Sequence, residues 1–179
     1  MRTVTFGAAC SLDGFIARAD HSVDWLQWSS DIADITARYW ETIDTVLMGR
    51  KTFEVGPTKG YPNVKNYVFS RTLEANPHPN VELVRDDAAK MVGALKRAPG
   101  KGICVMGGGQ LARALFDAGL IDEVGINVHP VLLRSGIPMF PESRQQLDLE
   151  LVECRPIKNG CVYLMYRVKV ARRSRRRGV

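Results

Sequence analysis

The chain has 179 residues, of which 45% are hydrophobic and 25% are charged, and it carries a formal net charge of +6. These proportions are ordinary for a globular domain and exclude low-complexity and fibrous classes. No apolar run approaches the roughly 20 residues of a membrane-spanning helix, and segment 1–6 reads as a strand rather than as a secretory signal. We therefore expect a single cytoplasmic domain over residues 1–170.

The positive charge is concentrated at the C-terminus. Segment 171–179 contains five arginines and no acidic residue, which leaves a net charge of only +1 for residues 1–170. We expect this segment to be a solvated, disordered tail. Nucleic acid is not an expected partner, apart from weak, salt-sensitive contact through these arginines.

The four cysteines show none of the CxxC or Cys/His spacings of a metal site; they are Cys10, Cys104, Cys154 and Cys161. The first two lie in apolar strand segments, which predicts buried thiols. The last two flank a predicted two-residue turn at Asn159-Gly160, which places Cys154 opposite Met165 and argues against a disulfide. Reduced thiols agree with a cytoplasmic setting.

Strand and helix patterns alternate along the first two thirds of the chain. In chain order, the expected elements are a strand at about 3–10, a helix at 30–41, strands at 45–48, 67–69 and 81–84, a helix at 87–97, a strand at 103–106, a helix ending near 118, a strand at 123–128, and a hairpin of 149–157 with 161–169. Apolar strands that alternate with helices indicate a parallel sheet covered on both faces. The fold class is therefore α/β, with a mixed, mostly parallel central sheet and a C-terminal antiparallel hairpin.

Two of these helices carry clear end signals. The helix at 30–41 starts after Ser29 or Ser30, either of which can cap its first N–H groups. The helix that ends near residue 118 follows three glycines directly and stops before Gly119, where a left-handed residue commonly closes a helix.

Basic, hydroxyl and glycine residues follow three of the predicted strands. They are Arg50-Lys51-Thr52, Ser70-Arg71 and Gly107-Gly108-Gly109-Gln110. Ligands of open α/β sheets bind beyond the carboxyl ends of the strands. A glycine turn lets backbone N–H groups and the positive end of a helix face an anion, and arginine offers paired donors to phosphate oxygens. The pattern predicts a site for a ligand with several phosphates.

Two common nucleotide-binding motifs explain this pattern less well. Segment 107–112 formally fits GxGxxA, but it lies late in the chain, and no acidic residue follows at the spacing that holds a ribose 2′-hydroxyl. Basic and hydroxyl groups in place of that acid favour a 2′-phosphate, and hence NADPH over NADH. No Gly-Lys-Ser/Thr follows a glycine at the spacing of a P-loop.

Four segments, taken in this order, resemble the dihydrofolate reductase superfamily, and more closely its branch that contains the reductase domain of riboflavin biosynthesis. They are AACSLDGFIA at 8–17, VLMGRKTFE at 46–54, VMGGG at 105–109, and PVLL to GIPMF within 130–140. The resemblance spans about residues 3–169. It implies a dihydrofolate reductase-like sheet of about eight strands and an NADPH-dependent reductase.

The resemblance also implies which residues bind the cofactor. The nicotinamide positions correspond to Ala9, Ile16 and Ala17; the positions for the pyrophosphate and 2′-phosphate to Gly49, Arg50, Lys51 and Thr52; those on the adenosine side to Ser70 and Arg71; and the pyrophosphate turn to Gly107, Gly108, Gly109, Gln110 and Leu111. Relatives in this branch are often homodimers, and the candidate contacts for pairing are the hairpin edge and the apolar residues Val124, Ile126 and Val128.

The candidate proton donors are three aspartates. Folate reductases have a Pro-Trp pair in the first loop and a buried carboxylate on the next helix, whereas here segment 22–26 lacks that pair and Ala33 occupies the carboxylate position between Asp31 and Asp34. Asp31 and Asp34 are otherwise expected to be exposed or to face the positive helix end. Asp13 is placed either to protonate substrate or to hold an Asp-Gly turn through its carboxylate.

Aromatic residues supply the candidate substrate contacts. Trp25 and Phe53 are expected either to line a substrate pocket, together with Trp28 and Trp40, or to belong to the core. A basic pocket for a ribosyl phosphate is not identifiable, and Arg134 stands where the riboflavin branch often has glycine. The histidines show no catalytic spacing and are expected at surface loop or strand positions; they are His21, His78 and His129.

The function expected from these features is hydride transfer from NADPH to a C=N or C=O group of a small, pterin- or pyrimidine-like heterocycle. The proton comes from solvent or from one of the three aspartates. Because the folate carboxylate is displaced, efficient reduction of dihydrofolate is not expected. The alternative is a catalytically weak NADP(H)-binding protein of the same fold with a regulatory role.

Overall fold

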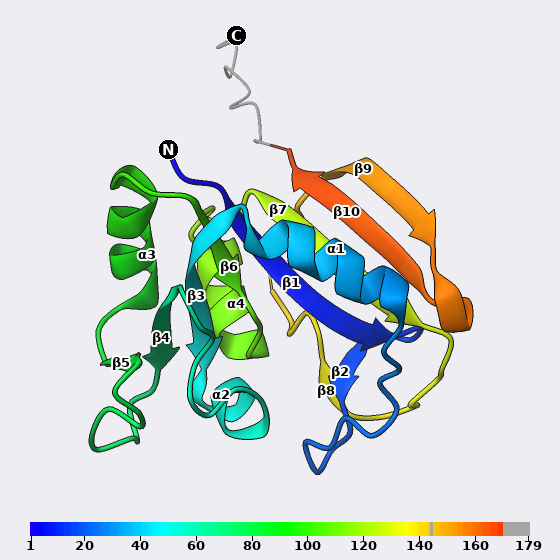
Figure 1. Ribbon diagram of the computed structural model, residues 1–179, viewed down its shortest axis with the longest axis horizontal. Helices are drawn as coiled ribbons and strands as arrows, with labels where there is room; N and C mark the ends of the chain where they lie inside the picture. The colour runs from blue at the N-terminus through cyan, green and yellow to red at the C-terminus, as the bar shows by residue number, and fades with distance from the viewer. Residues whose placement is uncertain (144, 170–179) are drawn as a thin grey trace, which may run out of the picture.

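An eight-stranded sheet forms the centre of the computed structural model, which describes residues 1–143 and 145–169 (Figure 1). The strand order is β5-β4-β3-β6-β1-β7-β10-β9. The strands are β1 (Val4–Ser11), β3 (Ile43–Gly49), β4 (Lys65–Phe69), β5 (Val81–Val84), β6 (Gly102–Val105), β7 (Glu123–His129), β9 (Leu149–Pro156) and β10 (Val162–Val168). The predicted tail at 171–179 lies outside the described residues.

Six strands run parallel from β5 to β7, and β10 is antiparallel to both β7 and β9. The predicted mixed, mostly parallel sheet with a C-terminal hairpin is therefore confirmed. The four helices are α1 (Ser30–Trp40), α2 (Arg50–Val55), α3 (Ala88–Arg97) and α4 (Gly109–Asp117). None of the helices in the described part of the chain is long and apolar enough to cross a membrane.

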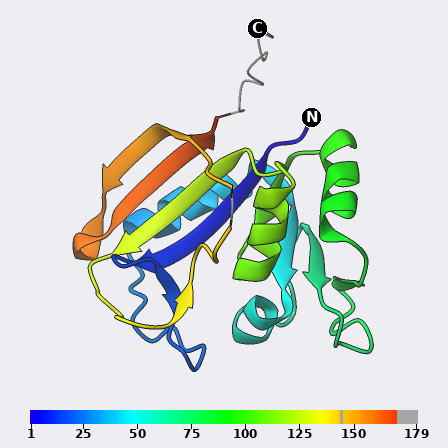
Figure 2. The same ribbon diagram turned by 180° about the vertical axis from the view of Figure 1, so that it is seen from behind.

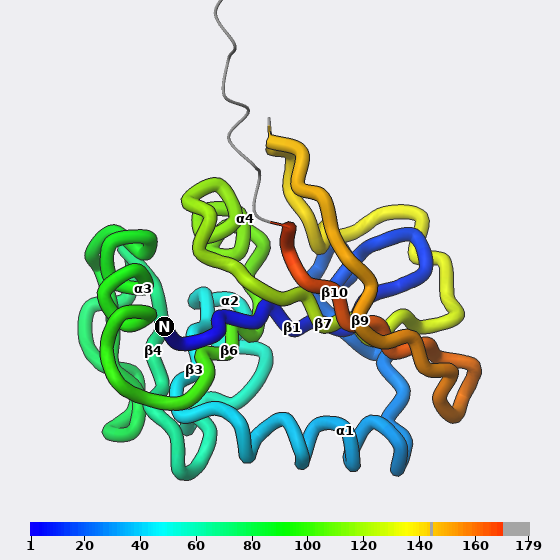
Figure 3. The backbone as a smooth tube through the Cα atoms, turned by 90° about the horizontal axis from the view of Figure 1, so that it is seen from above, coloured from blue at the N-terminus to red at the C-terminus, as the bar shows by residue number. Residues whose placement is uncertain are grey.

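The helices cover the two faces of the sheet unequally. Seen from above, α1 lies on one side of the strands, and α3 and α4 lie on the other (Figure 3). Figure 2 shows the face that α4 covers, where Phe6, Leu47 and Val105 are fully buried in the core shared with Leu115 of α4. On the opposite face α1 buries Ile32 and extends toward the closing hairpin.

The helix ends follow the sequence signals. Ser29 caps α1 by accepting a hydrogen bond from the backbone N–H of Ile32, and Asp87 caps α3 in the same way. Gly119 follows α4 with φ +64°, which confirms the predicted left-handed residue. Gly108 precedes α4 without any side-chain cap, so no side chain occupies the first N–H groups of that helix.

Two features of the fold differ from the predictions. A second, two-stranded sheet, which was not predicted, pairs β2 (Phe15–Ala17) with β8 (Ile137–Pro138). The hairpin closes through a three-residue 3₁₀ turn, Lys158–Gly160, which places Cys154 opposite Leu164 rather than Met165. All four cysteines are free thiols, and Cys10 and Cys104 are buried as expected.

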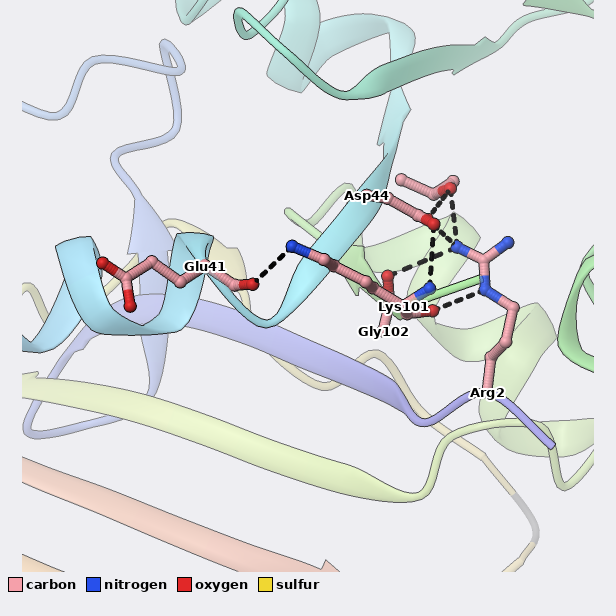
Figure 4. A network of polar contacts seen from close by, with 6 residues as sticks. Arg2, Glu41, Asp44, Lys101 and Gly102 are labelled. Carbon is pink, nitrogen blue, oxygen red and sulfur yellow. Dashed lines mark hydrogen bonds and ion pairs between the residues drawn. The ribbon is translucent and has the colours of Figure 1, made fainter. Parts of the chain in front are cut away.

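A buried arginine joins the amino ends of the central strands, opposite to their carboxyl ends. Arg2 donates hydrogen bonds to the carbonyl oxygen of Lys101 (2.6 Å) and to Thr45 Oγ1 (2.7 Å), and it forms an ion pair with Asp44 (Figure 4). Although partial burial of Asp44 opposes the effect, hydrogen bonds from Lys101 and Thr45 and the charge of Arg2 lower the pKa of Asp44. The network fixes β1 against β3 and β6.

Candidate functional site

A cavity of about 870 Å³ opens at the carboxyl ends of the parallel strands. Its walls come from the ends of β1, β3, β4, β5 and β6 and from the starts of α2 and α4. All fourteen predicted cofactor positions line it: Ala9, Ile16, Ala17, Gly49, Arg50, Lys51, Thr52, Ser70, Arg71, Gly107, Gly108, Gly109, Gln110 and Leu111. The structure therefore brings four separated sequence segments together around one space.

The floor of this cavity is a contact between two stretches of backbone. The N–H of Gly49 donates a hydrogen bond to the carbonyl oxygen of Gly107 (3.3 Å), and a Cβ atom at Gly108 would lie 3.2 Å from Gly49 Cα. Gly107 and Gly108 also have φ of +102° and +87°, a region that favours glycine. Both the close approach and the backbone conformation therefore require glycine here.

Positive groups surround this glycine contact. Arg50 forms an ion pair with Glu54 (2.7 Å) one helical turn away, and Lys51 lies 3.4 Å from the same carboxylate. The hydrogen bond from Arg50 holds the pKa of Glu54 below its ordinary value. Arg71 is exposed at the rim. With the uncapped start of α4, these groups suit a ligand that carries phosphates.

Arg85 is a fourth basic residue at this cavity and was not among the predicted site residues. It lines the same cavity and donates hydrogen bonds to the carbonyl oxygens of Leu73 and Glu74. Ser70 Oγ accepts hydrogen bonds from the N–H groups of Thr72 and Leu73 (both 3.1 Å). Arg85 and Ser70 therefore both stabilise the turn that carries Arg71.

A second cavity, of about 200 Å³, lies between α1 and the sheet. It borders the first cavity, because Ala8, Ala9, Leu26 and Met106 line both. Alternate residues of β1, β7 and β10 point into it, as the two-residue period of a strand requires. No lysine, arginine, aspartate or glutamate is among the described residues that line it.

The polar part of the second cavity centres on His129 at the end of β7. His129 is 2% exposed, and its Nε2 lies 3.1 Å from Asn127 Nδ2. Its Nδ1 lies 3.5 Å from Cys161 Sγ, and the Trp25 ring packs edge-on against its imidazole. His129 thus occupies a strand position, which was one of the two positions expected for it, and its side chain is buried. Its partner Asn127 lies two residues earlier on the same face of the strand, a spacing that does not by itself indicate a site.

The ionisable groups of this second cavity are neutral at physiological pH. Burial raises the pKa of the Cys104 thiol to about 12 and raises the pKa of Tyr39 and Tyr163 above the ordinary tyrosine value. Burial lowers the pKa of His129. The cavity wall therefore carries hydrogen-bonding groups without net charge.

None of the three candidate aspartates lines either cavity. Asp13 accepts hydrogen bonds from Ser11 Oγ (2.6 Å) and from the backbone N–H groups of Leu133 (3.2 Å) and Arg134 (2.8 Å). Asp31 accepts from the N–H of Lys158 (2.9 Å). Asp34 is exposed. The inward face of α1 instead presents isoleucines and a threonine to the second cavity, because the aspartates fall on other sides of the helix.

The two predicted aromatic substrate residues are buried, and neither lines a cavity. Phe53 packs in the core between α2 and the sheet, and Trp25 packs behind His129. Trp28 lines the second cavity with 74% of its surface exposed. Arg134 has φ +66°, a left-handed conformation that favours glycine.

The sheet and the position of its cavities define the dihydrofolate reductase-like fold. Dihydrofolate reductase from Enterococcus faecalis, complexed with NADP(H) and RAB-propyl, matches with a TM-score of 0.71 and 19% identity over 94% of this chain and 97% of that chain. A Shewanella sp. PV-4 protein named for riboflavin biosynthesis matches with a TM-score of 0.81 and 26% identity, over 95% of this chain and 100% of that chain.

Within this fold the chain belongs to the RibD C-terminal domain family, whose model matches residues 2–163. A curated relative, the uncharacterized protein YyaP of Bacillus subtilis (strain 168), is 32% identical over 180 residues. The alignment covers 92% of this chain and 94% of that protein. The predicted resemblance to the riboflavin-biosynthesis branch is therefore confirmed.

The backbone contact at Gly108 can be tested with alanine. A Cβ at Gly108 meets Gly49, whereas a Cβ at Gly119 has no heavy atom within 4 Å, although φ is positive at both positions. We expect Gly119→Ala to cost about 1 kcal/mol of unfolding free energy and Gly108→Ala about 1–2 kcal/mol more. Urea denaturation measures both unfolding free energies, and an equal loss in the two variants would contradict the close contact between the two backbones.

Replacement of Asp13 tests its role in the turn. The hydrogen bond from Ser11, against a smaller opposing effect of desolvation, lowers the pKa of Asp13 from 3.8. Its stabilising effect is then fully present above the unfolded pKa and is lost as the pH falls through the lower folded value. Asp13→Ala is expected to reduce the melting temperature at pH 7, by progressively less below about pH 4. The exposed Asp34→Ala serves as the control. An unchanged melting temperature in Asp13→Ala would contradict the turn role.

Proposed function

We propose that this protein is an NADPH-dependent reductase that acts on a small heterocyclic substrate. The observation that carries the proposal is the convergence of all fourteen predicted cofactor positions on one cavity. Membership of the RibD C-terminal domain family supports it, and so does the fold shared with a dihydrofolate reductase solved with NADP(H).

The residues of the larger cavity fit the parts of NADPH. Gly107, Gly108 and the start of α4 would hold the pyrophosphate through backbone N–H groups. Arg50 and Arg71 would hold phosphate oxygens on the adenosine side, including the 2′-phosphate. The nicotinamide would lie near Ala9, at the border with the second cavity, where Ala8, Leu26 and Met106 exclude water from the reacting atoms.

The second cavity would hold the substrate beside the nicotinamide. When bound, NADPH would supply a hydride from C4 of its nicotinamide ring to the carbon of a substrate C=N or C=O group, whose heteroatom would take a proton. Because no carboxylate is among the described residues of this cavity, we assign the proton to solvent. Efficient dihydrofolate reduction is therefore not expected.

The same lack of an acid favours a second candidate function, a catalytically weak NADP(H)-binding protein with a regulatory role. The two functions differ in turnover and not in cofactor binding. Oxidation of NADPH followed at its nicotinamide absorbance, across a panel of pterins and pyrimidines, distinguishes them.

The arginine assignment predicts cofactor selectivity. Arg50→Gln and Arg71→Gln are each expected to weaken NADPH binding about tenfold, the value of roughly one charge-assisted hydrogen bond. Binding of NADH, which lacks the 2′-phosphate, should change less. Arg113→Gln is the matched control, because Arg113 is an exposed arginine that pairs with Asp117 outside the cavity. Isothermal titration measures all three variants. Two results would refute the proposal. One is a wild-type Kd for NADPH weaker than about 1 mM, which corresponds to a binding free energy of about −4 kcal/mol. The other is a Kd for NADPH that is unchanged in both cavity variants.

We also propose that the protein is a homodimer that pairs along β9. Val124 and Ile126 are buried in the core, and both backbone edges of β7 are already paired, with β1 and β10, so these predicted contacts are unsuited to pairing. β9 instead ends the sheet and exposes Leu149, Leu151 and Val152. An apolar edge strand of this kind is suited to pair with a twofold-related copy.

A charge on this edge tests the dimer. Leu151→Lys is expected to shift the protein to monomer in sedimentation velocity, because the lysine would be desolvated beside its counterpart. Leu132→Lys, at an exposed leucine away from β9, controls for added charge and should leave the assembly unchanged. A monomeric wild type, or a dimeric Leu151→Lys, contradicts the pairing.

A further inference from the structure

We infer that His21 contacts the bridging phosphates of the proposed cofactor, and that the cofactor binds more tightly when the imidazole of His21 is protonated. This inference rests on the proposed function for the identity of the ligand. It goes beyond that function by naming a pH-dependent contact on the side of the larger cavity where the predicted cofactor positions carry no charge.

His21 has a backbone conformation that favours glycine. Its φ is +70°, a value that few non-glycine residues adopt. Three other non-glycine residues of the described chain have positive φ, and none of them lines either cavity; they are Asn63, Arg134 and Asn159. His21 lines the larger cavity. Residues held in such conformations cluster at active sites and ligand contacts, so this position indicates a role for His21 in the cavity.

Hydrogen bonds within segment 18–24 hold the turn that carries His21. The N–H of His21 donates to the carbonyl oxygen of Arg18, and the N–H of Arg18 donates to the carbonyl oxygen of Ser22 (both 3.0 Å). The Arg18 side chain forms an ion pair with Asp24 (2.7 Å). The backbone of the turn is therefore fixed without any contribution from the imidazole.

The imidazole of His21 has no hydrogen-bond partner among the described residues, unlike those of the other two histidines. His78 Nδ1 accepts a hydrogen bond from the N–H of Asn80 (3.2 Å). His129 Nε2 lies 3.1 Å from Asn127 Nδ2. His21 is half-buried at the cavity wall, so its ring nitrogens are available to a ligand.

His21 and the arginines of the larger cavity lie on opposite sides of the glycine bend at 107–109. Arg50 follows β3, Arg71 follows β4 and Arg85 follows β5. His21 follows β2, which comes directly after β1 (Figure 1). In the sheet, β6 and its bend lie between β3 and β1. A pyrophosphate at the bend would therefore have the arginines on one side and His21 on the other.

Protonation of His21 changes the charge that this side of the cavity presents to an anion. Segment 18–24 carries one arginine and two carboxyls, those of Asp20 and Asp24. Hydrogen bonds from Ser22 and from Arg18 lower the pKa values of Asp20 and Asp24 respectively, so both are ionised at neutral pH. With a neutral imidazole the segment has one excess negative charge, which opposes a phosphate. Protonation of His21 cancels that charge.

The other charged side chains that line the cavity all follow β3, β4 or β5; they are Arg50, Lys51, Arg71, Arg85, Asp86 and Asp87. The hydrogen bond from Arg50 lowers the pKa of Glu54, and burial raises the pKa of Tyr61. Histidine ordinarily changes charge between about pH 5 and pH 8, and His21 is the one histidine among the described residues that line this cavity. A pH-dependent affinity in that range therefore reports on His21 or on the 2′-phosphate of the ligand, which titrates near about pH 6.

The test is the affinity for NADPH and for NADH at about pH 6 and about pH 8.5. Calorimetric titration of the wild type is expected to give binding that is about tenfold tighter at the lower pH, the effect of one charge-assisted hydrogen bond. NADH keeps the bridging phosphates and lacks the 2′-phosphate. The same pH dependence with NADH therefore assigns the effect to the protein.

Two substitutions remove the imidazole and suit a positive φ. His21→Gly and His21→Asn are expected to bind NADH at both pH values as weakly as the wild type does at the higher pH, and to keep the melting temperature of the wild type. His78→Asn removes a histidine outside the cavity and is the matched control, which should keep the tenfold dependence. Arg50→Gln should weaken binding by the same factor at both pH values.

Proton NMR of the His21 imidazole, assigned by its loss in His21→Asn, gives a measurement that does not need the cofactor. Saturating inorganic pyrophosphate is expected to raise the midpoint of its titration by about one pH unit, the equivalent of a tenfold preference for the protonated form. A raised midpoint without binding of NADPH or NADH would refute the cofactor assignment alone. An NADH affinity independent of pH, a pH dependence that persists in both His21 variants, or a midpoint that pyrophosphate does not move would each overturn the role of His21.

Discussion

The contact between the backbones of Gly49 and Gly108 is the constraint on which the larger cavity depends. These residues end or follow two adjacent strands, β3 and β6, and no side chain separates them. The contact brings the starts of α2 and α4 side by side, so that the arginine on one helix and the free N–H groups of the other face the same space. A side chain at this point would separate the two helix starts and disperse the positive groups that line the cavity.

The two adjoining cavities differ in the charge of the side chains that line them. The larger is bordered by basic side chains and uncapped backbone, whereas the smaller has a neutral wall. Ala8, Ala9, Leu26 and Met106 form their shared boundary. Small and apolar residues at this boundary leave room for a flat ring from each side to approach the other. In the proposed function, the nicotinamide and the substrate would meet at this boundary.

The larger cavity could be predicted from the sequence, because the residues that line it lie directly after strands that the sequence also predicts. The glycine run, Arg50 and Ser70-Arg71 each follow an apolar strand, and parallel topology alone brings such strand ends to one edge. The smaller cavity depends on contacts between distant segments. His129 is recognisable only once Trp25 and Cys161 are packed around it, and Arg85 only once its strand lies beside the turn at Ser70. The hairpin register also escaped prediction, because Asn159-Gly160 suits a two-residue turn as well as the three-residue turn that forms.

Glu54 gives the larger cavity a further property. Its carboxylate contacts both Arg50 and Lys51, so the chain supplies its own counter-ion while no ligand is present. A single inorganic phosphate must compete with this internal anion and gains little by displacing it. A ligand that also engages the glycine bend and Arg71 has several attachment points from which to compete. In the proposed function, this carboxylate would therefore favour a ligand with several phosphates over a single inorganic phosphate.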